Sequence, residues 1–378
     1  MTALRNILSS EIWESRRVMR ALCSRVAYPQ SGCRLCTESC PADSIVFKDG
    51  YPHVGAGCLE CGACISSCPN GVFLPRQNRD IDILLPLVPS IKKRELQTIH
   101  YRCSNATGAS RSAVQLNCLG RLTEFLLVAP LVFGAERIVL AKGDCGNCRY
   151  SRTISHQDKI ITASRLLARA IGIEPNKIAL AETGAPEEIS DAHVPPPDRL
   201  ARRAFFTSIK SKSAGLAGML LASGRTIEQD QRAQVRQHNW RRTNLLAILS
   251  RLECRAELEV QQDILPAAEI TVGHECTGCG LCSCICPTGA LKNSMKEDLF
   301  EITFEAHLCT ACGNCEQACR FKAIRSSNTF NLKRLFDQKP QTLLRAAMKS
   351  CDSCGAGFIH SENDICELCR AETPKLAF

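Results

Sequence analysis

The residues with the most distinctive chemistry in this 378-residue chain are its 26 cysteines. Nearly all of them stand in Cys-x2-Cys pairs, a spacing that lets two thiolates bind one metal centre. In the run CTGCGLCSCICP at 276–287, three cysteines at intervals of three are followed by a fourth cysteine and a proline. Residues 309–320 repeat the pattern as CTACGNCEQACR, with Arg320 in place of the proline. This pattern is typical of chains that bind two [4Fe-4S] clusters.

The spacing has a physical cause. Three cysteines at these intervals wrap a loop round three corners of an iron–sulfur cube, and small residues such as Gly278 let the backbone approach the sulfides. The fourth cysteine reaches the neighbouring cube. Zinc also binds Cys-x2-Cys pairs, but zinc fingers need only two pairs and do not explain eight cysteines in this register. The predicted ligands are Cys276, Cys279, Cys282 and Cys319 for one cube, and Cys309, Cys312, Cys315 and Cys286 for the other.

A second dense group of cysteines lies near the N-terminus. Its run CLECGACISSCP at 58–69 is complete, whereas CSRVAYPQSGCRLCTESCP at 23–41 has Gln30 where the first cysteine belongs. We expect Cys23 to supply the missing ligand, because the intervening proline and glycine allow the chain to loop back; a [3Fe-4S] cluster on three thiolates is the competing outcome. The predicted ligands are Cys58, Cys61, Cys64 and Cys40 for one cube, and Cys33, Cys36, Cys68 and Cys23 for the other.

Four more cysteines are dispersed through the middle of the chain. Cys103 ends the run IHYRC, Cys118 follows, and Cys145 and Cys148 form a Cys-x2-Cys loop after the strand-like run RIVLA at 137–141. Parallel α/β sheets place their sites at the carboxyl ends of the strands. Four thiolates there are enough for one [2Fe-2S] centre or one zinc, and we favour the [2Fe-2S] centre.

The last four cysteines form a C-x2-C-x11-C-x2-C arrangement without a cluster-type proline. Short zinc ribbons have this form, so a structural zinc is predicted, with a rubredoxin-like iron site as the alternative. The predicted ligands are Cys351, Cys354, Cys366 and Cys369.

The secondary structure expected around these cysteines predicts a multidomain chain that combines α+β and α/β parts. RIVLA and the run KIALA at 177–181 each follow a helical pattern, and this alternation predicts a parallel α/β sheet. The dense groups at the two ends share one layout, which indicates an internal repeat. The predicted segments are a two-cluster module at 1–95, an α/β iron–sulfur domain at 96–192, a basic helical connector at 193–265, a second two-cluster module at 266–330 and a zinc-ribbon-like segment at 331–378.

The net charge of +9 is concentrated at 199–255, a stretch that contains twelve Lys and Arg residues and only three acidic residues. No recognition motif or aromatic platform accompanies them, so nucleic acid is not expected as a partner. A solvated connector and a docking surface for an acidic partner are the alternatives. The longest apolar run, 122–133, is too short to span a bilayer and contains Glu124. The start of the chain has no apolar signal-peptide core, and we expect a reducing cytoplasm.

Each dense cysteine group resembles the two-cluster ferredoxins of the bacterial type. The middle region, over roughly 97–185, resembles the delta-subunit family of methyl-viologen-reducing hydrogenases. That resemblance rests on a Cys-x-Gly-Arg element, a Gly-Ala pair and a Gly-Asp-Cys element, which are Cys118, Gly120 and Arg121, then Gly134 and Ala135, then Gly143, Asp144 and Cys145. The chain departs from the family in having only Cys103 in place of a first cysteine pair and Ala141 or Lys142 where another cysteine is usual. It also has the added Cys148.

The family resemblance implies a [2Fe-2S] centre and electron transfer between a hydrogenase and a heterodisulfide-reductase-like flavoprotein; formate dehydrogenase is a further candidate partner. No G-x-G-x-x-G, Walker or H-E-x-x-H motif is present, so no self-contained flavin, nucleotide or zinc-hydrolase site is expected. The sequence therefore predicts a non-catalytic electron-transfer subunit of a hetero-oligomeric complex. Two alternatives are a redox sensor acting in regulation and a reductase that uses an open iron site.

Overall fold

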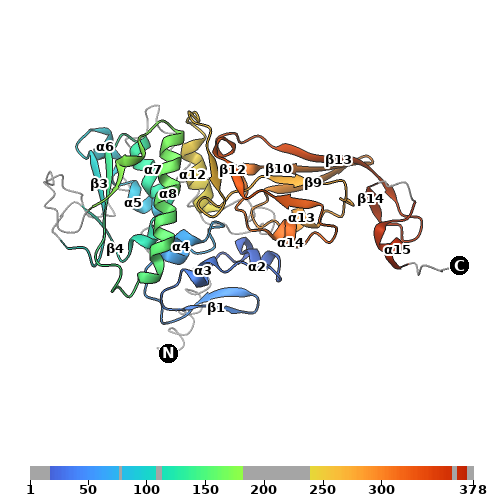
Figure 1. Cartoon of the computed structure of the whole chain (residues 1–378), viewed down its shortest axis with the longest axis horizontal. Helices are drawn as coiled ribbons and strands as arrows, with labels where there is room; N and C mark the ends of the chain where they lie inside the picture. The colour runs from blue at the N-terminus through green and yellow to red at the C-terminus, as the bar shows by residue number, and fades with distance from the viewer. Residues whose placement is uncertain (1–17, 76–78, 108–112, 182–238, 360–363, 373–378) are drawn as a thin grey trace, which may run out of the picture.

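The computed structural model describes residues 18–75, 79–107, 113–181, 239–359 and 364–372. Within them the chain is a mixed α/β protein with one parallel sheet and several antiparallel ones (Figure 1). Most of the basic stretch, and the proline run that precedes it, lie outside the described residues. Among the helices of these ranges, none is long and apolar enough to cross a membrane.

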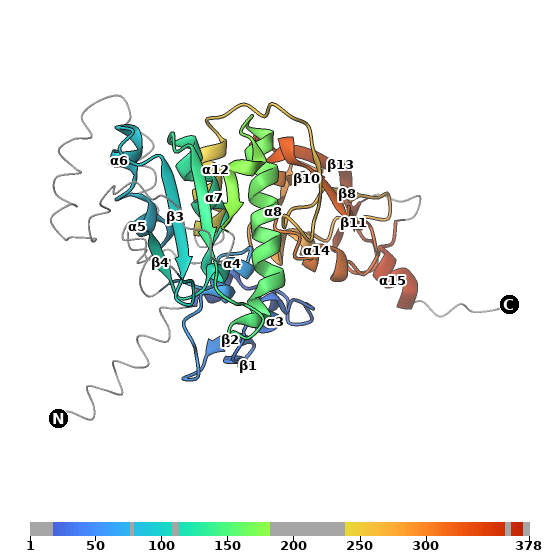
Figure 2. The same cartoon turned by 60° about the vertical axis from the view of Figure 1, so that its left-hand side comes forward.

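The predicted parallel sheet is confirmed. Its elements, in chain order, are β3 (Thr98–Cys103), β4 (Val114–Leu116), η2 (Leu119–Arg121), α7 (Glu124–Val132), β5 (Arg137–Ala141), η3 (Ser151–Thr153), α8 (Ile154–Ala170), η4 (Pro175–Lys177) and β6 (Ile178–Leu180), preceded by α5 (Asp80–Leu84) and α6 (Val88–Lys92). The strand order is β4-β3-β5-β6, and all three pairings are parallel. Figure 2 shows β3 and β4 side by side with α8 along the sheet.

Helix α7 lies in the core beneath this sheet and is buried along nearly its whole length, although it contains Pro130. Proline lacks the N–H group that would bond to the carbonyl four residues earlier, which here is that of Leu126. The hydroxyl of Tyr101, on β3, donates to this carbonyl at 2.9 Å, and both residues are fully buried. A bond between strand and helix thus replaces the one that the proline removes.

The two cysteine-dense groups share one order of elements, as their common layout predicts. The N-terminal module contains η1 (Arg20–Leu22), α2 (Ser24–Ala27), α3 (Leu35–Glu38), β1 (Ile45–Lys48), β2 (Tyr51–Val54) and α4 (Ala63–Ser67). The second module contains β8 (Ile270–Val272), α13 (Leu281–Cys284), β9 (Leu291–Lys296), β10 (Leu299–Phe304), η5 (Ala306–Leu308), α14 (Asn314–Gln317) and β11 (Ile324–Ser326). Each module places a hairpin between two short helices. Its ends pair in antiparallel fashion, through a bridge from Val18 to Phe73 in the first and through β8 and β11 in the second.

Strands on both sides of the second module extend it. They are β7 (Glu259–Gln261), which pairs with β12 (Thr329–Asn331), and β13 (Gln341–Ser350), which pairs with β10 and with β14 (Gly357–Ile359). The turn η6 (Leu332–Leu335) and helix α15 (Glu367–Glu372) complete this part. The boundaries predicted at 265 and 330 follow the cysteine motifs, whereas strand pairing extends beyond both of them.

The N-terminal module lies below the other two parts in Figure 1, and the α/β domain and the second module share a hydrophobic core. Helix α12 (Trp240–Leu249) joins all three parts: it packs on α7, its Trp240 indole donates to the Gly71 carbonyl at 2.9 Å, and Arg242 donates to the Cys309 carbonyl at 2.9 Å. Arg241 and Arg242 are both buried. These two of the twelve basic residues therefore belong neither to a solvated connector nor to a docking surface, because their charges bind groups inside the protein.

Candidate iron–sulfur and metal centres

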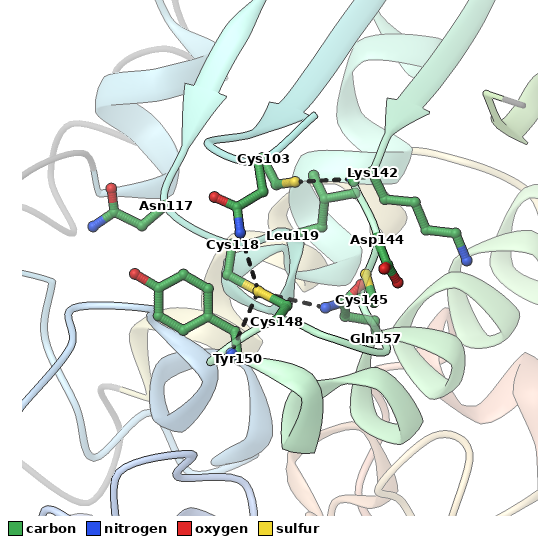
Figure 3. A pocket seen from close by; sticks show the side chains of 12 residues that line it. Cys103, Asn117, Cys118, Leu119, Lys142, Asp144, Cys145, Cys148, Tyr150 and Gln157 are labelled. Atoms are coloured by element: carbon green, nitrogen blue, oxygen red, sulfur yellow. Dashed lines mark hydrogen bonds between the residues drawn. The ribbon is translucent and has the colours of Figure 1, made fainter. Parts of the chain in front are cut away.

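The four cysteines predicted for the middle centre line one pocket at the carboxyl edge of the parallel sheet (Figure 3). Cys103 is the last residue of β3, Cys118 follows β4 by two residues, and Cys145 and Cys148 lie in the loop after β5. The carboxyl ends of adjacent parallel strands meet at one edge, which is why residues up to 45 positions apart converge here. Burial raises the pKa of the Cys118 and Cys145 thiols. Because thiolates in this pocket are unfavourable alone, the thiols suit a cationic centre that supplies the compensating charge.

Backbone N–H groups point at three of these sulfur atoms. Gly143 donates to Cys103 at 3.3 Å, Gly120 to Cys118 at 3.4 Å and Tyr150 to Cys148 at 3.4 Å. Side chains donate as well: Gln157 reaches the Cys118 sulfur at 3.4 Å, and Asn105 reaches the Cys148 sulfur at 3.3 Å. These donors were not predicted from the sequence, because no local pattern links them to the cysteines that they contact.

We expect Gly143→Ala to disrupt the middle centre alone. A Cβ atom at this position would lie 2.2 Å from the backbone oxygen of Asn105, so the loop that carries Cys145 must shift. For the [2Fe-2S] centre predicted from the sequence, the expected result is loss of its signal in electron paramagnetic resonance (EPR) spectra, with the signals of the predicted cubes unchanged. Gly146→Ala is the matched control in the same loop, because its Cβ would meet only a side-chain oxygen of Asp144 at 3.3 Å. Equal loss of this signal in both variants would show that the contact with Asn105 is not the cause.

Cys23 lies with the three cysteines to which the sequence assigns it. Cys23, Cys33, Cys36 and Cys68 line one pocket of the N-terminal module. Burial is the main cause that raises the pKa of Cys36, and neighbouring thiols, among them Cys23, add to it. Burial is also the main cause that raises the pKa of Cys68, to about 11. Gln30 is exposed and accepts a hydrogen bond from the Tyr28 hydroxyl at 2.7 Å.

The other four cysteines of this module also gather. Burial is the largest cause that raises the pKa of Cys61, to about 11, and the nearby thiols that add to it are those of Cys118, Cys40 and Cys58. The pKa of Cys64 is raised well above its usual range by burial and by Cys61, Cys58, Cys36 and Cys40. Cys61 and Cys118 belong to one buried apolar cluster with Tyr150 and Ala63. This set therefore adjoins both the middle pocket and the pocket of Cys23.

In the second module the cysteines gather in two groups. The first set is Cys286, Cys309, Cys312 and Cys315, which line one pocket. Burial raises the pKa of Cys309 to about 11 and that of Cys312 to about 12, with Cys286 as a contributing neighbour of each. The other set has Cys282 at its centre: burial, and then Cys276, Cys279 and Cys319, raise its pKa to about 12. Cys279 is exposed.

The last four cysteines are much closer together. The sulfur atoms of Cys351, Cys354, Cys366 and Cys369 all lie within 4.8 Å of one another, and those of Cys354 and Cys366 are 3.8 Å apart. Tetrahedral zinc with Zn–S bonds of about 2.3 Å requires S···S distances of about 3.8 Å. The backbone N–H of Cys366 donates to the Cys351 sulfur at 3.2 Å and is the main cause that lowers the pKa of Cys351 to about 6. The set therefore fits one tetrahedral ion.

Comparison with known protein families gives two matches. Residues 99–193 match the model of the methyl-viologen-reducing hydrogenase delta subunit, and residues 302–325 match that of a 4Fe-4S binding domain. Comparison with curated proteins and with solved structures gave no match. The first match covers all four cysteines of the middle pocket, and the resemblance predicted for this region is confirmed. The second covers the motif from Cys309 to Cys319 and supports [4Fe-4S] binding by the chain.

Proposed function

We propose that this chain is an electron-transfer subunit that relays single electrons between redox enzymes. Four [4Fe-4S] clusters and one [2Fe-2S] centre would bind to the five sets of cysteines assigned above, with Cys23 as the fourth ligand of its cube, and one zinc would bind to the last four cysteines. The hydrogenase-type domain supports a partner of that class. Hydrogenase, formate dehydrogenase and a heterodisulfide-reductase-like flavoprotein are the proposed partners in a hetero-oligomeric complex, and the cytoplasm is the proposed location.

The observation that carries this proposal is the continuous succession of the five cysteine sets. The middle set adjoins the next through Cys118 and Cys61. Cys64 and Cys36 are neighbours across the two sets of the N-terminal module. Cys312 lines the pocket of Cys23, and Cys315 neighbours Cys282 in the last set. Each set therefore adjoins the next, which is the arrangement that stepwise electron transfer requires.

Buried hydrogen bonds connect the N-terminal module to the second module beside their cysteine sets. Thr310 donates to Asn70 at 2.5 Å, Asn70 donates to the Ser24 hydroxyl at 2.9 Å, and Asn314 donates to the Ser24 carbonyl at 2.9 Å. All four residues are buried. Ser24 follows Cys23 and Asn314 follows Gly313 of the second module's motif, so two cluster-binding loops share one network of hydrogen bonds.

Metal analysis of anaerobically purified protein tests the proposal. Four cubes and one two-iron centre predict about 18 irons per chain, with matching sulfide and one zinc. EPR spectra of the reduced protein should contain signals of both cluster types. Colourless oxygen-free protein, with zinc as the metal at every cysteine set, would contradict the relay.

We expect Cys366→Ser to remove the zinc and to leave the iron content unchanged. Cys366 is a buried member of the tetrahedral set, and loss of one of four thiolates breaks the coordination. Zinc and iron are measured together by plasma emission spectroscopy. Cys284→Ser is the matched control, because Cys284 is exposed and belongs to none of the assigned sets. The zinc assignment fails if the variant keeps its zinc or if the wild-type site holds a single iron.

A further inference from the structure

The sulfur atom of Cys118 accepts three hydrogen bonds. The donors are the Gly120 backbone N–H at 3.4 Å, the Gln157 side-chain amide at 3.4 Å and the Thr153 hydroxyl at 3.3 Å. Cys118 is 5% exposed, Gln157 8% and Thr153 0%. The bonds are therefore shielded from water, where they are stronger than at the surface.

The direction of the Thr153 bond follows from the state of the sulfur. A thiolate that binds a centre has no hydrogen to donate, so with Cys118 as a ligand the Thr153 hydroxyl is the donor. The Gln157 amide also donates to the Thr153 oxygen, at 2.8 Å. The two side chains lie four residues apart at the start of α8, so one helical turn delivers both donors.

Such donors favour the reduced form of a bound cluster. A thiolate ligand becomes more negative when its centre accepts an electron, and a hydrogen bond to a negative acceptor is stronger. Hydrogen bonds to the sulfurs are among the factors that set cluster potentials. Lys142 also lines the pocket, and its charge offsets part of the burial effect that raises the pKa of Cys145, so it acts in the same direction.

We propose that Thr153 and Gln157 are positioning residues that, through Cys118, raise the reduction potential of the middle centre and make it the electron-accepting end of the relay. This inference rests on the proposed function. The electron would come from the neighbouring cube of the Cys61 set, which would be oxidised by one electron as the middle centre is reduced by one. The Cys118 sulfur would carry part of the added charge, and Thr153 and Gln157 would stabilise that charge.

The inference is tested by redox titration of the full-length protein followed by EPR. Thr153→Val removes the hydroxyl donor with little change in shape. We expect the equilibrium constant for reduction of the middle centre to fall about ten-fold, which equals about 59 mV for one electron. Gln157→Glu replaces the amide donor by a carboxylate of the same size, and it should lower this equilibrium constant at least as much. The potentials of the cubes should stay at their wild-type values.

Two further variants separate hydrogen bonding from packing. Thr153→Ser keeps a hydroxyl and should retain the wild-type potential, and Ser155→Val changes an exposed residue of the same helix turn and should have no effect. In wild-type protein given less than one electron per chain, the two-iron signal should dominate; in Thr153→Val the signal should move towards the cubes. An unchanged potential in folded Thr153→Val and Gln157→Glu would overturn the inference while the relay remained. Absence of any two-iron signal in the wild type would instead overturn the proposed centre itself.

Discussion

Replacement of Cys23 by serine is expected to damage one of the four proposed cubes and to leave the other three intact. Cys23 is 8% exposed and shares a pocket with Cys33, Cys36 and Cys68, so its loss leaves three thiolates at that site. A cube with three cysteine ligands loses its fourth iron readily, and a [3Fe-4S] signal should appear in EPR spectra of the oxidised protein. The iron content should fall by about one to four atoms per chain, according to whether the remaining cluster survives.

Two control variants make this result specific. Cys254→Ser removes a half-buried thiol that donates to the Ala256 carbonyl at 3.3 Å, outside the assigned sets, and should leave every spectrum unchanged. Gln30→Cys introduces a thiol where the sequence pattern expects one. Because Gln30 is exposed and faces the Tyr28 hydroxyl, this thiol should not restore the cube in a Cys23→Ser background. Full rescue by Gln30→Cys, or normal cubes in Cys23→Ser, would show that the ligand assignment is wrong.

The second large effect is expected at the buried ion pair between α7 and α12. One terminal nitrogen of Arg241 lies 2.8 Å from both carboxylate oxygens of Glu124, and their side chains are 7% and 5% exposed. Arg241→Met leaves the carboxylate without its partner in the core. The free energy of unfolding should fall by about 3–5 kcal/mol, because a buried charge is left uncompensated. Denaturant unfolding followed by circular dichroism of the helices measures the change.

A double-mutant cycle tests the cause. Glu124→Gln combined with Arg241→Met removes both charges. This double variant should lower the free energy of unfolding by less than Arg241→Met alone. Arg251→Met, at an exposed arginine two residues beyond α12, should change the free energy of unfolding by less than about 0.5 kcal/mol.

The same ion pair makes stability depend on pH. Although burial raises the pKa of Glu124, Arg241 holds it below its ordinary value of 4.5. The contribution of the pair is therefore present above pH 4.5 and is lost as the pH falls through the lowered value. Equal cost in the single and double variants would contradict the ion-pair account.

Much of the candidate site could be predicted because cluster ligands follow local rules. A loop that wraps three corners of a cube needs cysteines at fixed short intervals, so the sets in both modules can be written from spacing alone. The position of Cys23 beside Cys33, Cys36 and Cys68 could be predicted because Cys23 is the only cysteine upstream of Cys33. The parallel sheet could be predicted because its strands and helices alternate in the runs RIVLA and KIALA.

The remaining features depend on contacts between distant residues. Arg241 and Arg242 look like parts of a solvated basic stretch, and only the packing of α12 shows that they are buried. Strand β13 contains no cysteine, so nothing in the motif spacing indicated that it pairs with β10. Thr153 and Gln157 contact Cys118 over 35 and 39 positions, beyond the reach of any local pattern. Long-range strand pairing and side-chain hydrogen bonds are set by the folded structure as a whole, and short sequence windows do not contain them.

The hydrogen bond from Asn314 to the Ser24 carbonyl has a consequence for biosynthesis. The two residues are 290 positions apart, so at ribosomal rates of about 5–20 residues per second they emerge about 15 to 60 seconds apart. Throughout that interval the pocket beside Cys23 lacks the wall that residues 310–312 later provide. One side of this pocket is thus exposed while the rest of the polypeptide is still being translated, and arrival of the second module covers that side.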